Sequence, residues 1–283
     1  ARVESWDGTN FTEVGDMNTG RAYVGGSGTQ TQAIAFGGSP PSSYQSITEA
    51  WNGTNWYEVN DLNTSRGDIG SAGQTGSNAL GFAGYGGGPV GTLARTETWN
   101  GAVWTEVNDL SVQRTGSDGA GTNTSGLAFG GNTQDPRGIG GYTEEWNADF
   151  LYGVWASGGN LNLARGHGAA AGSRDATITF GGIDNSPAEV ANTELYNGTT
   201  WGELNDLNIA RRFLAGAGTS TSALGFGGNP SPSRAANESW NGTSWTETGD
   251  LNTGRRILMG TGSSNTNALC FGGSPALAIN ESW

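Results

Sequence analysis

The chain has 283 residues, 34% of them hydrophobic, and its 26 acidic residues against 13 basic ones give a net charge of −13. All the basic residues are arginines and they form no cluster, which excludes the cationic stripe that a nucleic-acid binder needs. No stretch approaches the ~20 apolar residues of a membrane helix, so we expect no membrane insertion. With one His and one Cys, the chain lacks a ligand set for zinc or copper, and we expect no metal and no cofactor.

A Phe-Gly-Gly triplet, with Ala for the first Gly in the second copy, occurs six times at intervals of 46, 47, 51, 46 and 45 residues. The triplets begin at Phe36, Phe82, Phe129, Phe180, Phe226 and Phe271. A period near 47 is typical of propeller blades rather than of helical solenoids. The repeats run from end to end, so we expect one domain over residues 1–283.

Each unit divides into four short segments, a to d, separated by turn residues. In the fifth complete unit they are Arg211–Gly218, Ala223–Gly228, Asn237–Trp240 and Trp245–Thr248. No segment shows a sustained 3.6-residue apolar period, so we expect almost no helix. Four antiparallel strands per unit make one propeller blade.

Segments c and d flank an Asn-Gly pair, as in Trp51-Asn52-Gly53-Thr54-Asn55-Trp56. Asn-Gly is a strong hairpin signal because both residues accept positive φ. A two-residue loop would pair Trp51 with Thr54, and a four-residue loop would pair Trp51 with Trp56; the sequence leaves both open. In the fourth unit this connection is several residues longer, over 147–155.

The pattern of a glycine pair, a third-strand aromatic and a fourth-strand Trp, here Gly37-Gly38, Trp51 and Trp56, resembles kelch-like propellers. The resemblance covers the whole chain and implies an all-β, six-bladed β-propeller of four-stranded antiparallel blades. The motif Trp-Asn-Gly-Thr-x-Trp resembles the kelch-like repeat arrays of marine bacteriophages and aquatic metagenomes. That resemblance implies a structural role in a virion or outside a cell.

The chain begins and ends within a segment c, Val3–Trp6 and Asn280–Trp283. Six blades therefore close if the N-terminal c–d hairpin pairs with the last a–b pair, Arg255–Gly273. One strand, 279–283, is then left over. It either displaces residues 1–6, or pairs with a neighbouring copy, or shows that the chain is part of a longer array.

Three polar residues recur in register. An Asp precedes segment a by several residues, at Asp16, Asp61, Asp109, Asp206 and Asp250, with Asn160 in the fourth unit. An Arg follows it, at Arg21, Arg66, Arg114, Arg165, Arg211 and Arg255, and segment c carries Glu49, Glu97, Glu144, Glu194, Glu238 and Glu281. We expect Asp–Arg pairs to lock the d-to-a turn, and we expect each Glu to pair with the repeat Arg or to face solvent.

The residues that could perform catalysis are few. His167 stands alone between Gly166 and Gly168, and Ser117–Thr122 only faintly resembles a sialidase Asp-box. The repeated acids have six-fold symmetry, whereas a catalytic carboxylate pair must be asymmetric. We therefore expect no asymmetric cluster of His, Cys or acids, no catalytic residue and no enzymatic activity.

The loops between segments b and c differ in every unit, and all must emerge on one face of the ring. Binding residues commonly lie on such connections. Loops that have diverged in sequence without binding any ligand would show the same variation. The candidate binding residues are Tyr44, Arg95, Asp135, Arg137, Asp184, Asn185 and Arg234.

The sequence predicts a non-enzymatic structural or adhesion module of a virion or an extracellular surface. Its partners would be other structural proteins of the same particle or surface glycans or receptors, and a homo-oligomer is an alternative assembly. The competing hypothesis is a carbohydrate-active enzyme, a glycosidase or lyase, or a lectin, that uses acids of the same face.

Overall fold

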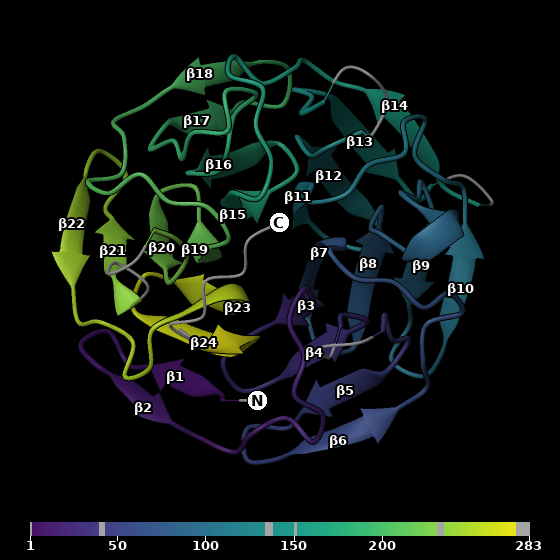
Figure 1. The fold of residues 1–283 in the computed structure, drawn as a ribbon, viewed down its shortest axis with the longest axis horizontal. Coiled ribbons are helices and arrows are strands. Elements are labelled where there is room, and N and C mark those ends of the chain that lie inside the picture. Colours follow the sequence, from purple (N-terminus) through teal and green to yellow (C-terminus); the bar gives the residue numbers. More distant parts are fainter. Residues whose placement is uncertain (1, 40–42, 134–137, 150–151, 231–234, 276–283) are drawn as a thin grey trace.

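Six four-stranded antiparallel sheets stand around one axis in the computed structural model, which describes residues 2–39, 43–133, 138–149, 152–230 and 235–275 (Figure 1). The predicted six-bladed β-propeller is confirmed. From the axis outward every blade presents segments a, b, c and d, which become strands a to d, and in five of the six blades this is also the chain order. Helical structure in the described ranges is confined to short 3₁₀ turns, such as η1 (Gly88–Val90).

Five blades are continuous in sequence. Blade 2 contains β3 (Gly25–Gly28), β4 (Ala33–Phe36), β5 (Thr48–Trp51) and β6 (Trp56–Val59). Blade 3 contains β7 (Gly70–Thr75), β8 (Asn78–Phe82), β9 (Thr96–Trp99) and β10 (Trp104–Val107), and blade 4 contains β11 (Asp118–Gly121), β12 (Ser125–Phe129), β13 (Thr143–Asn147) and β14 (Val154–Ser157). Blade 5 contains β15 (Ala169–Ser173), β16 (Ala176–Phe180), β17 (Thr193–Tyr196) and β18 (Trp201–Glu203), and blade 6 contains β19 (Ala215–Thr219), β20 (Ser222–Phe226), β21 (Asn237–Trp240) and β22 (Trp245–Thr248).

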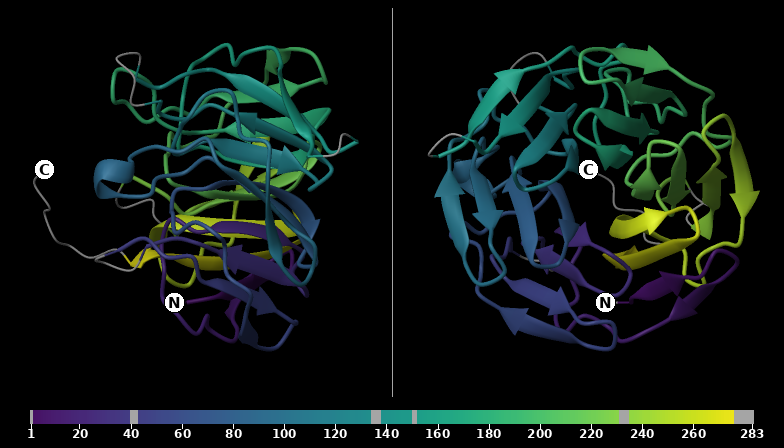
Figure 2. Two further views of the ribbon diagram at one scale, coloured as in Figure 1. Left: turned by 90° about the vertical axis from the view of Figure 1, so that its right-hand side faces the viewer. Right: turned by 180° about the vertical axis from the view of Figure 1, so that it is seen from behind.

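Blade 1 is shared by the two ends of the chain, as predicted. Its strands are β23 (Arg255–Ser264), β24 (Asn267–Pro275), β1 (Glu4–Trp6) and β2 (Phe11–Glu13), and β1 pairs with β24 through Glu4↔Cys270 and Trp6↔Ala268 (Figure 2). This pairing closes the ring and leaves no open strand edge between its first and last blades. The surplus segment 279–283 lies outside the described residues.

The c–d hairpins have four-residue loops. Trp51 pairs with Trp56, and the Asn52 side-chain oxygen accepts the N–H groups of Thr54 and Asn55 at 3.0 and 2.9 Å, while Gly53 takes a φ of 92°. The Asn side chain therefore builds the turn, and the glycine supplies the left-handed residue that it requires. In blade 4 the connection is longer, but Trp146 still pairs with Trp155.

The repeat arginines pair with the repeat glutamates inside each blade, and the predicted Asp–Arg pairs are wrong. Arg21 donates to Glu49 at 2.9 Å, and both side chains are buried; the other pairs are Arg66–Glu97, Arg114–Glu144, Arg165–Glu194, Arg211–Glu238 and, in blade 1, Arg255–Glu4. Glu281 lies outside the described residues. Four of the aspartates instead accept a backbone N–H at the start of strand c, as Asp61 accepts the Thr48 N–H at 3.0 Å; the other three are Asp16, Asp109 and Asp206.

Aromatic side chains fill the space between neighbouring blades. The Phe that ends strand b packs on the first aromatic of strand d in the next blade, as Phe36 does on Trp104 at 4.7 Å between ring centroids. The equivalent contacts are Phe82–Trp155, Phe129–Trp201, Phe180–Trp245, Phe226–Phe11 and Phe271–Trp56. Each such pair adds roughly 0.5–1.5 kcal/mol beyond its buried area, so the ring is a rigid scaffold.

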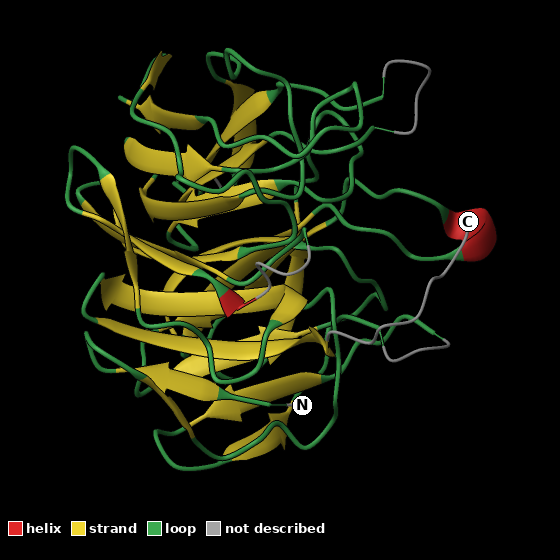
Figure 3. Cartoon of the chain, turned by 60° about the vertical axis from the view of Figure 1, so that its left-hand side comes forward, coloured by secondary structure: helices red, strands yellow, loops and turns green. Residues whose placement is uncertain are grey.

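The two faces of the propeller differ. Antiparallel order places the b–c loops and the d–a connections at one end of every blade, and the c–d hairpins at the other. On the first face η1 projects well beyond the strands, whereas the opposite face has short turns (Figure 3). The b–c loops therefore share one face, which we call the loop face.

Candidate functional site at the mouth of the axial channel

Six backbone segments, one per blade, form a closed ring where the d–a connections reach the axis. The ring residues are Tyr23, Asp68, Gly116, His167, Phe213 and Ile257, and all have a φ between 55 and 61°. Each donates its N–H to the carbonyl oxygen of the ring residue in the preceding blade, at 2.8 to 3.4 Å, and Tyr23 completes the circuit by donating to Ile257. This backbone ring surrounds the mouth of a channel of about 520 Å³ on the loop face.

Side chains at these positions carry a conformational cost. Left-handed backbone costs a non-glycine residue roughly 1–2 kcal/mol, and Gly116 shows that glycine fits the position. Five blades nevertheless carry a side chain there, including the β-branched Ile257. Strain of this kind is held in place by surrounding structure and is commonly found at functional sites.

Comparison of the repeats within the chain shows where the inner strands differ. The position after the ring residue is a buried aliphatic residue in four blades, Val24, Ile69, Leu214 and Leu258. In blades 4 and 5 it is Ser117 and Gly168. The next position is Gly, Ala or Met in five blades and Asp118 in blade 4. The polar departures therefore lie in two adjacent blades.

Asp68, Thr115 and His167 meet at the mouth from three successive blades. The Asp68 carboxylate lies 3.6 Å from His167 Nδ1 and accepts the Thr115 hydroxyl at 2.6 Å. Burial opposes the charged form of His167, but the Asp68 carboxylate outweighs it and raises the pKa of the imidazole. Burial likewise opposes the charged form of Asp68, but His167 and Thr115 outweigh it and lower the pKa of the carboxyl. Each group thus favours the charged form of the other.

Gly116 makes room for this imidazole. A Cβ atom at Gly116 would lie 2.2 Å from His167 Cε1. The absence of a side chain at one ring position therefore allows His167 to fill that sector of the mouth.

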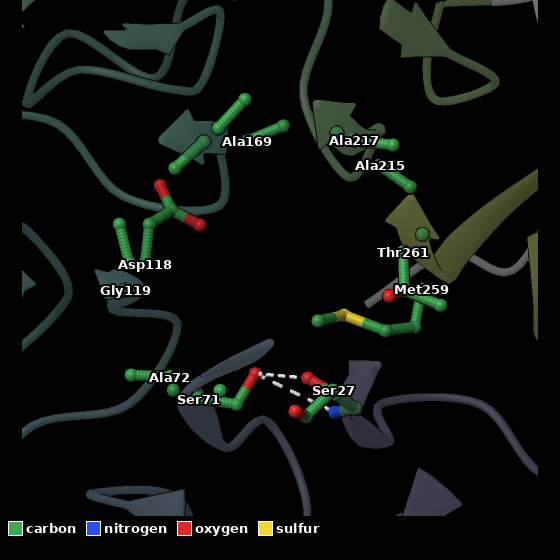
Figure 4. A pocket seen from close by; sticks show the side chains of 18 of the residues that line it. Ser27, Ser71, Ala72, Asp118, Gly119, Ala169, Ala215, Ala217, Met259 and Thr261 are labelled. Atoms are coloured by element: carbon green, nitrogen blue, oxygen red, sulfur yellow. Dashed lines mark hydrogen bonds between the residues drawn. The ribbon is translucent and has the colours of Figure 1, made fainter. Parts of the chain in front are cut away.

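Asp118 is the second carboxyl group of the site. It lies at the wall of the channel beside Ala169, with Met259 reaching in from the other side (Figure 4). Burial raises the pKa of Asp118 to about 7, in spite of His167, Arg165 and the Gly168 N–H, which all favour its charged form. Asp118 is thus a carboxyl group that changes charge near neutral pH.

The expectation of no asymmetric cluster is wrong. Asp68, Asp118 and His167 act on one another at the mouth, although they are far apart in the sequence. The sequence contained a sign of this cluster in segment a. When the units are aligned on the repeat Arg, Asp118 of the Arg114 unit stands where the Arg211 unit has Ala215. Within the described ranges no group of three or more His, Cys, Asp or Glu side chains is placed to hold a metal ion.

The candidate residues of the b–c loops are dispersed over the loop face. Tyr44 packs against Tyr85 at 5.5 Å and lies beside Gly67, the residue before Asp68, at the rim of the mouth. Burial and the nearby Asp68 charge raise its pKa. Arg95 pairs with exposed Glu106. Asp135, Arg137 and Arg234 lie outside the described residues.

Two neighbouring candidates have structural partners. Asp184 accepts the N–H groups of Ser186 and Ala188 within its own loop. Asn185 bridges to the adjacent blade, where it accepts the Ile139 N–H and donates to the Ile139 carbonyl oxygen, both at 2.9 Å. The structure therefore brings only Tyr44 of the described candidates to the mouth.

Aromatic rings and arginines complete the rim. Phe213 packs against His167 with the rings tilted and their centroids 4.6 Å apart, and it meets Tyr23 edge-on at 6.4 Å. The Arg212 guanidinium lies 5.2 Å from the centre of the Phe213 ring and 3.3 Å from a Glu189 oxygen. The mouth thus presents aromatic surfaces beside hydrogen-bonding groups, a combination typical of small-ligand sites.

The described part of the chain contains no helix long and apolar enough to cross a membrane. No family model and no curated protein matches the chain. Among solved structures it is similar to that of YjhT, with a TM-score of 0.77 and 13% sequence identity over 93% of both chains. At this identity the likeness shows the shared propeller fold.

Proposed function

We propose that this protein is a non-enzymatic, kelch-like recognition module that adheres through its loop face, as part of a virion or an extracellular surface. The observation that carries the proposal is the position of the differences between repeats. They fall in the b–c loops and in the ring at the channel mouth, whereas five of the six c–d hairpins of the opposite face repeat one design. Repeated features serve the scaffold, and features that differ on one face serve recognition.

The rigidity of the scaffold supports this function. Six buried Arg–Glu pairs and a closed backbone ring fix the relative positions of the loops. A site held on rigid elements loses little conformational entropy on binding. The many loops around one mouth suit a multivalent contact with glycans or with another protein of the same particle.

Glycans are the favoured partner because the mouth is concave and combines Tyr23 and Phe213 with the carboxyl groups of Asp68 and Asp118. A glycan array tests this with three proteins: wild type, Asp68→Asn in the mouth, and Thr199→Ala on an exposed hairpin of the opposite face. We expect wild type and Thr199→Ala to bind glycans, and Asp68→Asn to bind them at least about tenfold more weakly. Loss of binding in Thr199→Ala alone, or stable docking to another particle protein without any glycan binding, would contradict glycan recognition.

One observation favours a second candidate, a carbohydrate-active enzyme. A carboxyl group that is half protonated near neutrality, such as Asp118, suits general acid catalysis. The neighbouring His167–Asp68 pair gives the site the asymmetry that such chemistry requires. If the protein cleaves the glycans that it retains on the array, at a rate that falls above pH 7 and vanishes in Asp118→Asn, its function is catalysis rather than adhesion.

A further inference from the structure

The outer strand of blade 4 differs from the outer strands of the other five blades. In each of those five an exposed Glu lies opposite the buried repeat Glu of strand c, as Glu58 lies opposite Glu49. The other exposed glutamates of this kind are Glu13, Glu106, Glu203 and Glu247. In blade 4 the same register places Ser157 opposite Glu144. Of the six outer strands, all of which the structure describes, β14 is thus the one without a charged side chain.

The glutamates protect the edges of the sheets. Each outer strand ends its sheet, so that its outward backbone N–H and C=O groups face solvent and can pair with a strand of another chain. A charged side chain on an edge strand opposes such pairing. Because the five side chains are exposed, packing inside the blade does not explain why they recur. The change to Ser157 removes this protection from one edge.

The segment that leads into β14 adds exposed aromatic surface. Tyr152 is 62% exposed, more than any other large hydrophobic residue of the described ranges. Its backbone is fixed, because the carbonyl oxygens of Tyr152 and Gly153 accept the N–H and the side-chain amide of Asn108 at 3.1 and 2.7 Å. Trp155 is partly exposed, whereas the first aromatic residue of each other outer strand is only 5–6% exposed. This edge therefore combines available backbone groups with apolar surface.

We propose that β14 is a dimerisation edge, which pairs with β14 of a second copy of this chain. The edge lies on the circumference of the propeller, away from the axis (Figure 1). Antiparallel pairing about a two-fold axis joins the two copies of blade 4 into one continuous sheet. The inference goes beyond the proposed function and does not depend on the ligand of the loop face.

The distribution of charge favours a second copy as the partner. With a net charge of −13, two copies repel each other over most of their surfaces. Pairing of β14 with itself brings two uncharged edges together, whereas pairing with any of the other outer strands places a Glu at the contact. Because each copy has one such edge, the assembly closes as a dimer and does not grow into a fibre.

The shortness of the edge sets the strength of the dimer. β14 has four residues, so the strand pair and the two Tyr152 side chains bury far less than the roughly 2,000 Å² of a permanent dimer. The association is therefore weak and reversible. It brings two loop faces into one particle, which raises the avidity for a multivalent ligand.

Analytical ultracentrifugation of the full chain, from low to high micromolar concentration, tests the proposal. We expect wild type to convert reversibly from monomer to dimer. Ser157→Glu restores the charge of the five equivalent positions and places it at the interface twice, so it should weaken the dimer at least about tenfold. Thr246→Glu, at an exposed position of β22, adds the same charge to another outer strand and is the matched control, which dimerises like wild type. Unchanged melting temperatures show that both variants fold.

Two further measurements test the same edge. Glu247→Ser creates a second uncharged outer strand, so each molecule can pair twice, and we expect assemblies larger than a dimer. Hydrogen exchange at low and high protein concentration locates the contact. The N–H groups of β14 should become protected as the dimer forms, whereas those of β6 and β10 should not change.

A wild type that stays monomeric throughout this range, a dimer that Ser157→Glu leaves unchanged, or equal weakening by Thr246→Glu would overturn the proposal. The same holds if Glu247→Ser forms nothing larger than a dimer, since edge charge then does not limit pairing. Protection of β14 only when another protein of the particle is added would assign the edge to that partner and would also overturn the proposal.

Discussion

The indole nitrogen of Trp56 is buried without a hydrogen-bond partner because Val3 stands where a threonine stands in four other blades. In those blades the strand-d Trp donates to the hydroxyl of the first residue of strand c in the preceding blade, as Trp201 does to Thr143 at 3.0 Å. The other pairs are Trp104–Thr48, Trp155–Thr96 and Trp245–Thr193. Both partners differ at the interface between blades 6 and 1. Phe11 stands there in place of the strand-d Trp, and Asn237 in place of the Thr that begins strand c.

Val3→Thr should therefore stabilise the protein. Thr has nearly the shape of Val, and its hydroxyl would satisfy Trp56 Nε1, for a gain of about 1 kcal/mol. In a chain of this length that gain raises the melting temperature by roughly 2 °C. The reciprocal change Thr143→Val should lower it, because it leaves Trp201 Nε1 unpaired. An unchanged melting temperature in both variants would show that these bonds contribute nothing.

Glu4→Gln should weaken the closure of the ring. Glu4 accepts Arg255 and the Asn252 N–H, both at 2.8 Å, and removing its charge leaves a buried Arg255 unpaired, at a cost of about 3 kcal/mol. We expect hydrogen exchange to rise first in β1 and β24. Glu49→Gln removes the same charge inside blade 2, where chain connectivity holds the strands, and serves as the control. Equal protection of β1 in the two variants would contradict a closure role for Glu4.

Gly116→Ala should displace His167 from the mouth. The added methyl group would occupy the position of the imidazole, and a φ of 61° disfavours alanine by roughly 1 kcal/mol or more. Separation from Asp68 then lowers the pKa of His167 toward its ordinary value. The imidazole NMR signal reports this directly, since the chain has a single His. An unshifted titration would place His167 elsewhere in solution.

The His167–Asp68 pair also predicts a dependence of stability on pH. The folded-state pKa of His167 is raised, so its contribution is complete below the unfolded value near 6.5 and is lost as the pH rises through the folded value. Asp68→Asn removes this contribution. Chemical denaturation should therefore show a larger loss of stability for Asp68→Asn at pH 6 than at pH 9, and a pH-independent difference would rule out the pairing.

Asp118→Asn should stabilise the protein above pH 7. The pKa of Asp118 is raised to about 7, so the folded state holds a proton that the unfolded state releases above pH ~4. Stability from this group is complete below pH 4 and is lost as the pH rises to 7. The variant should match wild type at pH 4 and exceed it at pH 8. A variant less stable than wild type at pH 8 would show that the Asp118 charge is well satisfied.

The candidate site could be predicted only in part. Tyr44 on a b–c loop was found because loops that differ between repeats stand out in the sequence, and it lies beside Gly67 at the rim. The central groups were missed because segment a looks like scaffold. Asp68, Asp118 and His167 belong to three units, and only the convergence of the d–a connections at the axis joins them.

By itself the sequence determined the blade number, the four strands of each blade and the closure by the two ends of the chain, because period, turn residues and aromatic spacing are local properties. The tertiary structure alone decided which partner each charged residue takes. Arg21 reaches Glu49 rather than an Asp, and the left-handed ring aims Asp68 and His167 at one another. Such choices depend on distances across the sheet and around the axis, and these distances exist only once the blades have packed.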